Sequence, residues 1–260
     1  MDKVPPAAAF LDLSDYGRPF ARWLVRRLLP TRIAPNHLTL AFTLAGLAAA
    51  TLFAIDRWLP LAGVLLLVKS GLDAADGALA RARARPSRVG RFSDSVADFA
   101  VNVAVYSAIA WAAYRTSAQP GYIVLAALSL PSALLQVSLF NHYYVRYRAQ
   151  AGGDRTSQLQ EAHAAGYPWD DPALLRLVFA LYRAIYSWQD RLATVFDRVL
   201  SGGSTRPLTP AFMTANSVLG LGTQLLIIAI CAFINQPAWA LWLFATVFNL
   251  YAVFLALSRR

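Results

Sequence analysis

Long uncharged stretches alternate with short charged ones along this chain of 260 residues. Residues 38–55 and 121–145 contain no Asp, Glu, Lys or Arg, and neither does the stretch 207–258. A helix needs about 20 mainly apolar residues to cross the hydrocarbon core of a bilayer. The first two runs therefore predict one membrane-spanning helix each. The third predicts two, separated at the Asn-Gln-Pro triplet 235–237.

Two further apolar runs, 58–72 and 96–114, flank an acidic segment and predict helices that enter and leave on the same side. Backbone groups in lipid must be hydrogen-bonded internally, which favours helices. The runs lack the alternation of an outer-membrane barrel. The chain is 57% hydrophobic and only 15% charged, whereas soluble domains carry about 25% charged residues. The sequence therefore predicts an all-α integral membrane protein with six transmembrane helices.

The basic residues predict the orientation of these helices. Most lie before residue 34, between the second and third spans, in 146–206, or at the C-terminus, and Lys69 lies inside the second span. Only Arg57 and Arg115 remain for the opposite face. Because cytoplasmic loops are rich in Lys and Arg, we expect a multi-pass protein of the inner, cytoplasmic membrane with both termini in the cytoplasm. The net charge of +10 favours anionic lipid headgroups as partners, and no nucleic acid is expected because the arginines lie beside spans.

Two amphipathic segments are predicted outside the spans. In 16–30, arginines recur every four residues among apolar ones, which predicts an N-terminal cytoplasmic helix lying in the membrane interface. In 172–200, charged residues recur every seven positions, which indicates an interfacial or packing helix, or one that shapes a binding site. The expected organisation is an N-terminal segment, 1–34, and a six-helix membrane domain, 35–260, with a cytoplasmic insert at about 150–206.

Four aspartates crowd into the segment between the second and third spans. Each charged residue at mid-membrane costs about 2.5–3.5 kcal/mol, so these side chains must lie at the cytoplasmic edge or in a wet cavity, near positive charge. Asp73 and Asp76 are three residues apart and Asp94 and Asp98 are four apart, so each pair shares a helix face. Pro86 breaks the chain between the pairs. The sequence predicts a helical hairpin whose acidic faces converge.

Four converging carboxylates form an oxygen-rich site that suits Mg²⁺ or Mn²⁺, and the absence of Cys and His from the segment argues against zinc. Two such ions about 3.5–4 Å apart can clamp a phosphoryl centre. Gly77 leaves bare backbone for a ligand, and Arg81, one turn further on, can bind a phosphate through two nitrogens. The alternative is a set of Asp–Arg ion pairs that solvate a loop, but ion pairing tolerates any spacing and does not explain Gly77.

The spacing of these residues resembles a known family signature. At every fixed position it is similar to that of the CDP-alcohol phosphotransferases, written here as Asp73-x2-Asp76-Gly77-x2-Ala80-Arg81-x8-Gly90-x3-Asp94-x3-Asp98. The segment PNHLT at 35–39 resembles the family's entry into the first span. YVRYRAQ at 144–150 resembles the run after the fourth span in its phosphatidyltransferase members. The resemblance implies a homodimer whose 35–260 region is catalytic.

The resemblance also implies roles for individual residues. Asp73 and Asp94 would bridge two metal ions, Asp76 would bind one, and Asp98 the other. Asp98 is also implied as the base that takes the proton of the acceptor hydroxyl. A carboxylate beside two dications is a weak base, so Asp98 as a metal ligand alone, with water taking the proton, stays open. The residues implied to contact the CDP moiety and its diphosphate are Asn36, Thr39, Gly77, Arg81 and Ser87. Asn36 is also a natural helix N-cap, where free N–H groups face phosphate.

The implied reaction is attack by an alcohol on the β-phosphate of a CDP-linked lipid, with CMP leaving. The donor is CDP-diacylglycerol with a small alcohol as acceptor or, alternatively, CDP-choline or CDP-ethanolamine with diacylglycerol. Arg146 and Arg148 follow the fourth span and can bind a phosphate on the acceptor, although any span can have such a positive flank. An ion-coupled transporter is a remote alternative, because the acids cluster at one end of a single hairpin.

Overall fold

The computed structural model describes residues 4–153 and 165–260, so residues 1–3 of the N-terminal segment and 154–164 of the predicted insert lie outside it. Over the described residues the chain is helical and contains no strand, which confirms the predicted all-α class. The α-helices are α1 (Arg18–Leu28), α2 (Pro35–Ile55), α3 (Leu59–Ala82), α4 (Arg88–Ser117), α5 (Gly121–Gln150), α6 (Pro172–Leu200), α7 (Pro210–Asn216), α8 (Leu221–Phe233), α9 (Ala238–Ala245) and α10 (Val247–Leu257). Short 3₁₀ turns are η1 (Pro6–Ala8), η2 (Leu13–Asp15) and η3 (Ser217–Leu219).

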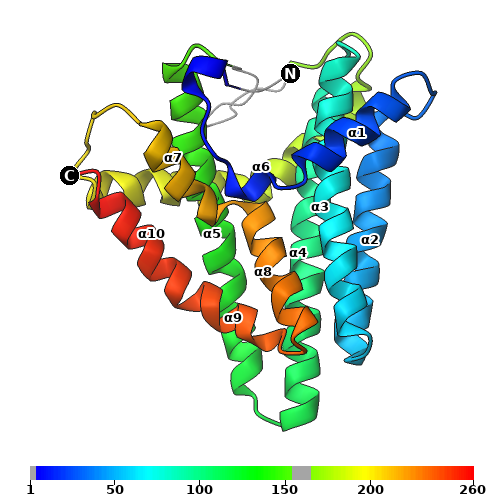
Figure 1. Ribbon diagram of the computed structural model, residues 1–260, viewed down its shortest axis with the longest axis vertical. Coiled ribbons are helices and arrows are strands. Elements are labelled where there is room, and N and C mark those ends of the chain that lie inside the picture. Colours follow the sequence, from blue (N-terminus) through cyan, green and yellow to red (C-terminus); the bar gives the residue numbers. More distant parts are fainter. Residues whose placement is uncertain (1–3, 154–164) are drawn as a thin grey trace.

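The helices α2, α3, α4 and α5 run side by side along the length of the molecule (Figure 1). The α3–α4 loop and α1 lie at one end, and the α2–α3 and α4–α5 turns lie at the other. Each of these two turns is closed by a residue in the left-handed region, Asp56 with φ 55° and Ala118 with φ 55°. The acidic segment therefore lies at the end of the bundle opposite to Arg57, which is in the α2–α3 turn, and to Arg115, which is in the last turn of α4.

Among the described residues, four helical stretches are long and apolar enough to cross a membrane, namely α2, α4, α5 and Ala238–Leu257. A fifth span results if the Pro210–Leu219 and Leu221–Phe233 pair, bent by 49°, is counted as one. The second predicted span, 58–72, lies almost entirely in α3 and is absent from this group. Lys69, Asp73 and Asp76 lie within α3, and these charges set it apart from the other candidate spans.

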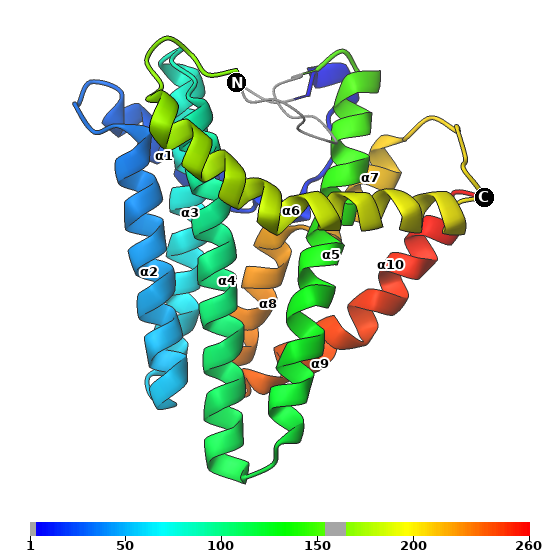
Figure 2. The ribbon, with the colours of Figure 1, turned by 180° about the vertical axis from the view of Figure 1, so that it is seen from behind.

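Helix α6 crosses the bundle at a steep angle to α4 and α5 (Figure 2). Its bounds match the amphipathic segment predicted at 172–200. It starts where the side chain of Asp171 accepts a hydrogen bond of 2.7 Å from the backbone N–H of Leu174. Its apolar side stacks on the start of α4, where the ring of Phe92 lies 5.1 Å from Phe179 and 4.8 Å from Tyr182. Helix α6 is therefore a packing helix for α4.

The segment before α1 is tied to the rest of the bundle by close backbone contacts. The N–H of Leu13 donates a hydrogen bond of 2.9 Å to the hydroxyl of Ser217. A Cβ atom on Gly222 would lie 1.8 Å from the carbonyl oxygen of Ser14, so only glycine allows this approach. Helix α1 then packs Ala21 and Val25 against α3. The N-terminal segment thus spans the space between α3 and the start of α8.

Candidate functional site

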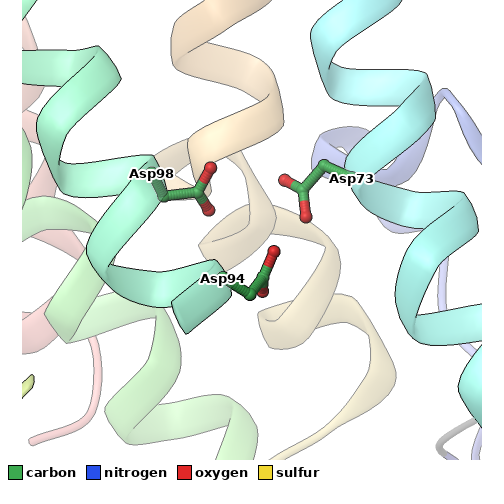
Figure 3. Close-up of side chains that lie close together, drawn as sticks. All are labelled: Asp73, Asp94 and Asp98. Carbon is green, nitrogen blue, oxygen red and sulfur yellow. The ribbon is translucent and has the colours of Figure 1, made fainter. Parts of the chain in front are cut away.

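The end of α3 and the start of α4 bring three aspartates together. Asp73 on α3 and Asp94 and Asp98 on α4 point their carboxylates into a common space (Figure 3). One oxygen from each lies within 4.8 Å of the others. Two oxygens bound to one Ca²⁺ or Mg²⁺ ion lie at most about 4 to 5 Å apart, twice the metal–oxygen distance. The spacing of the three carboxylates therefore suits a shared hard dication.

Asp94 supplies an independent indication that this space suits a cation. Its Oδ1 atom is buried and has no hydrogen-bond partner among the described residues. A buried carboxylate oxygen without a partner lowers stability unless something satisfies it. A divalent cation would do so, and oxygen ligands without sulfur or imidazole favour Mg²⁺ or Mn²⁺ over zinc.

The fourth predicted ligand, Asp76, is placed differently. Its side chain is buried, and its Oδ2 atom accepts a hydrogen bond of 2.5 Å from the hydroxyl of Thr39 on α2. Asp76 is outside the group of three, and the hydroxyl of Thr39 is engaged with a carboxylate. The structure thus gathers three of the four predicted metal ligands and links the fourth to a residue predicted to hold the diphosphate.

Lys69 is a member of the site that the sequence did not reveal. Its side chain is fully buried, and its Nζ atom forms an ion pair with Asp98 and lies 3.4 Å from Oδ2 of Asp73. In the sequence Lys69 stands out only as a charge within a predicted span. The available signal was its spacing of four residues before Asp73, which places both on one face of α3.

The residues predicted to contact CDP lie at the starts of α2 and α4 and near the end of α3. A Cβ atom on Gly77 would lie 3.3 Å from a guanidinium nitrogen of Arg81, so the glycine leaves room for that side chain. A Cβ atom on Gly90 would lie 3.2 Å from Oδ1 of Asn36. The prediction of Asn36 as an N-cap is wrong: Pro35 opens α2 and Ala34 is the cap. Proline fits the first helical position because it has no N–H to satisfy there, so Asn36 lies one residue further into the first turn.

Ser87 caps α4 and is held by a residue of the predicted insert. Its Oγ atom accepts a hydrogen bond of 2.9 Å from the N–H of Gly90 and donates one of 2.6 Å to Asp170. Asp170 also accepts from the backbone N–H of Arg88 at 2.9 Å and of Tyr167 at 3.0 Å. Partial burial acts to raise the pKa of Asp170, but these hydrogen bonds outweigh it and lower the pKa below its ordinary value. The segment before α6 therefore fixes the start of α4, one helical turn before the aspartates.

We expect Asp170→Asn to lower the melting temperature by a few degrees, because the amide replaces an ionised acceptor at the start of α4. Since the folded-state pKa is lowered, this stabilisation is fully present above the ordinary Asp pKa and is lost as pH falls through the folded value. The melting-temperature gap between variant and wild type should be constant near pH 7 and shrink below about pH 4.

Asp171→Asn is the matched control for this experiment. The neighbouring Asp171 caps α6, and asparagine caps a helix about as well as aspartate, so its melting temperature should stay near wild type. A gap for Asp170→Asn that persists unchanged at low pH would show that the charge of Asp170 does not stabilise the fold.

Of the two arginines predicted to bind the acceptor, Arg148 is buried and Arg146 is partly exposed, and both have partners within the protein. A nitrogen of Arg146 lies 2.7 Å from Oδ2 of Asp197 on α6, and the guanidinium of Arg148 lies 4.9 Å from the ring centre of Tyr144. Arg148 is only 3% exposed. Both guanidinium groups therefore make contacts within the protein, beyond the positive charge that is expected beside any span.

Asp197 is the centre of a buried polar network between α5 and α6. Besides Arg146, it accepts a hydrogen bond of 2.7 Å from the hydroxyl of Tyr143 and lies 3.2 Å from Nε2 of His142. Burial acts to raise the pKa of Asp197, but the hydrogen bonds from His142 and Tyr143 and the charges of His142 and Arg146 outweigh it and hold the pKa well below its ordinary value. Sequence spacing revealed Asp197 as part of a polar stripe but not its partners on α5.

A cavity of about 100 Å³ lies against Asp73, between the N-terminal segment, α3 and the start of α8. It is large enough for a few water molecules or a small hydroxylated group. The N-terminal segment lines it with Ser14, Asp15 and Gly17, α3 with Ser70, Asp73 and Ala74, and α8 with Leu221, Gly222 and Leu225. Polar atoms from two separate parts of the chain thus face one space beside the aspartates.

Comparison with known proteins gives a family match, sequence relatives and a solved structure. The sequence pattern of the family described as CDP-alcohol phosphatidyltransferase matches residues 32–196, which is more than half of the chain. This stretch includes α2 to α5 and nearly all of α6.

Two curated relatives are archaeal. The bifunctional IPC transferase and DIPP synthase of Thermococcus kodakarensis is 31% identical over 159 residues, covering 61% of this chain and 35% of the relative. The archaetidylinositol phosphate synthase of Pyrococcus horikoshii is 46% identical over 66 residues, covering 25% of this chain and 35% of the relative. The matches thus span about a third of each relative's length.

Among solved structures, the phosphatidylinositol phosphate synthase of Mycobacterium tuberculosis with CDP-DAG bound shows 19% identity and a TM-score of 0.40. The match covers 88% of this chain and 94% of that one. A score at this level is too low to support a functional conclusion.

Proposed function

Because the chain belongs to the CDP-alcohol phosphatidyltransferase family, we propose that it transfers a phosphatidyl group from CDP-diacylglycerol to a small alcohol and releases CMP. The observation that supports this most strongly is the group of Asp73, Asp94 and Asp98 carboxylates at the α3–α4 hairpin. These residues occupy the signature positions whose spacing matches the family.

We propose that Asp73, Asp76, Asp94 and Asp98 hold two divalent cations, Mg²⁺ or Mn²⁺. When bound, such ions neutralise the charge of a diphosphate and polarise its oxygens. The residues proposed to hold the CDP moiety and its diphosphate are Asn36, Thr39, Gly77, Arg81 and Ser87. Arg81 stabilises the negative charge of the departing CMP, and Asp98 accepts the proton of the attacking hydroxyl.

The proposed setting is the cytoplasmic side of the inner membrane. There the acyl tails of the donor stay in the bilayer while its headgroup reaches the aspartates. In this arrangement α3 is the remaining span, with its charged end in the wet site. Helix α1 lies in the interface, with Arg26 and Arg27 of its last turn near anionic headgroups. Residues 1–34 form the cytoplasmic segment and 35–260 the catalytic domain, within a homodimer.

The cavity beside Asp73 supports a small hydroxylated acceptor. Ser14, Ser70 and Asp15 offer it hydrogen-bonding groups. We propose that Arg146 and Arg148 bind a phosphate on that acceptor, which requires Arg146 to exchange the carboxylate of Asp197 for the phosphate. The name of the Pyrococcus relative makes inositol phosphate the first acceptor to test.

The test is CMP release by the purified full-length protein in detergent. With CDP-diacylglycerol and an acceptor, we expect release that EDTA abolishes and that added Mg²⁺ or Mn²⁺ restores. Inositol phosphate, glycerol 3-phosphate and their unphosphorylated parent alcohols should be compared at equal concentration. A preference for the phosphorylated forms supports the two arginines as acceptor ligands, and equal use would remove them from that role.

The identity of the CDP-linked donor that the protein uses distinguishes two functions found in this family. Activity with CDP-choline or CDP-ethanolamine and diacylglycerol, and none with CDP-diacylglycerol, would assign the chain to the aminoalcohol phosphotransferases. Absence of CMP release from every CDP-alcohol would contradict the proposed function.

A further inference from the structure

Lys69 joins three helices at the aspartate site. It lies on α3 one turn before Asp73, and its side chain is 0% exposed. Its Nζ atom forms an ion pair with Asp98 on α4, lies 3.4 Å from Oδ2 of Asp73, and lies 4.8 Å from the ring centre of Phe42 on α2. Its contacts therefore cross the α3–α4 hairpin rather than running only along one helix.

The burial of this ammonium group has a physical requirement. A buried charge without partners lowers stability strongly, and so do neighbouring carboxylates that repel one another. The pairing of Lys69 with Asp73 and Asp98 removes both problems at once. Phe42 adds a favourable cation–π contact on the remaining side. Lys69 can therefore keep these two aspartates close together without any bound ion.

The same contacts place Lys69 in competition with a metal ion. Asp73 and Asp98 belong to the group of carboxylates that can hold a dication. A dication that binds them must share their oxygens with the ammonium or displace it, and in either case it meets a positive charge close by. The positive charge of Lys69 thus opposes metal binding, while its hydrogen-bonding position orients the ligands as an outer partner does.

We propose that Lys69 is a positioning residue that assembles Asp73 and Asp98 in the ion-free protein and limits how tightly a divalent cation binds there. This inference rests on the metal site proposed above. It predicts that loss of the charge strengthens metal binding, whereas a residue with only a packing role would weaken binding or leave it unchanged when replaced.

The experiment measures Mn²⁺ affinity of the full-length protein in detergent from the electron paramagnetic resonance signal of free Mn²⁺. Lys69→Met keeps the apolar stem and removes the charge, and it should bind Mn²⁺ about tenfold more tightly or better. Lys69→Arg keeps the charge and should stay within about threefold of wild type. Arg57→Met removes a positive charge at the exposed α2–α3 turn and should change nothing.

The outcomes separate this inference from the proposed function. If wild type binds Mn²⁺ and Lys69→Met binds it equally or more weakly, the positioning role is overturned and the metal site stands. If wild type binds none, the metal site and the inference both fall. If Lys69→Met and Lys69→Gln fold only when Mn²⁺ is present during purification, the inference is supported. If neither folds even then, Lys69 is purely structural and the inference is overturned.

Discussion

Asp94→Asn is expected to lower the rate of CMP release by on the order of a thousandfold or more, with the folded protein preserved. The amide matches the carboxylate in size but is neutral, so the proposed site would lose one full negative charge and one anionic ligand. Oδ1 of Asp94 is already buried without a partner among the described residues, so the fold does not depend on a hydrogen bond that this oxygen accepts. The measurement is CMP release at saturating CDP-diacylglycerol and Mg²⁺.

The matched control is Asp56→Asn, the same substitution at the exposed turn between α2 and α3. Asparagine tolerates the left-handed conformation of that position, so both activity and melting temperature should stay near wild type. An Asp94→Asn protein that releases CMP within tenfold of the wild-type rate would contradict a role for Asp94 in metal binding.

Asp197→Ala is expected to lower the free energy of unfolding by about 3–5 kcal/mol, because it leaves Arg146 without its carboxylate in a mostly buried network. The hydroxyl of Tyr143 loses its acceptor at the same time. The measurement is thermal unfolding of the detergent-solubilised protein, followed by the loss of helical circular dichroism.

The double variant Asp197→Ala/Arg146→Met is the control for this explanation. Removing the arginine as well eliminates the unpaired charge, so the double variant should be more stable than Asp197→Ala alone. The single variant Arg146→Met is measured as well. If the double variant is less stable than wild type by the sum of the two single effects, the ion pair contributes nothing to the destabilisation.

The hairpin was predictable because it is determined by residues that lie close together in the sequence. Spacings of three and four residues fix which side chains share a helix face, and a proline between two apolar runs fixes where the chain turns. The structure accordingly brings Asp73, Asp94 and Asp98 together. The approximate positions of α2 and α4 follow from their apolar runs, and that of α6 follows from the charges that recur every seven positions.

The partners of these residues were not predictable, because they come from helices distant in sequence. Asp76 turns toward Thr39, which lies on α2. Arg146 meets Asp197 across 51 positions, and Lys69 meets Asp98 across 29. Such contacts depend on how neighbouring helices cross, which side-chain spacing within one helix does not determine. Apolarity alone does not assign α3 as a span, because Lys69, Asp73 and Asp76 lie within it.

The central claim is that the α3–α4 hairpin gathers carboxylates in order to bind divalent cations. The most direct test is a crystal structure of the protein with Mn²⁺, with diffraction data collected at the manganese absorption edge. The account predicts two anomalous peaks among Asp73, Asp76, Asp94 and Asp98. Strong peaks elsewhere, with these carboxylates paired only to Lys69 and Arg side chains, would contradict it.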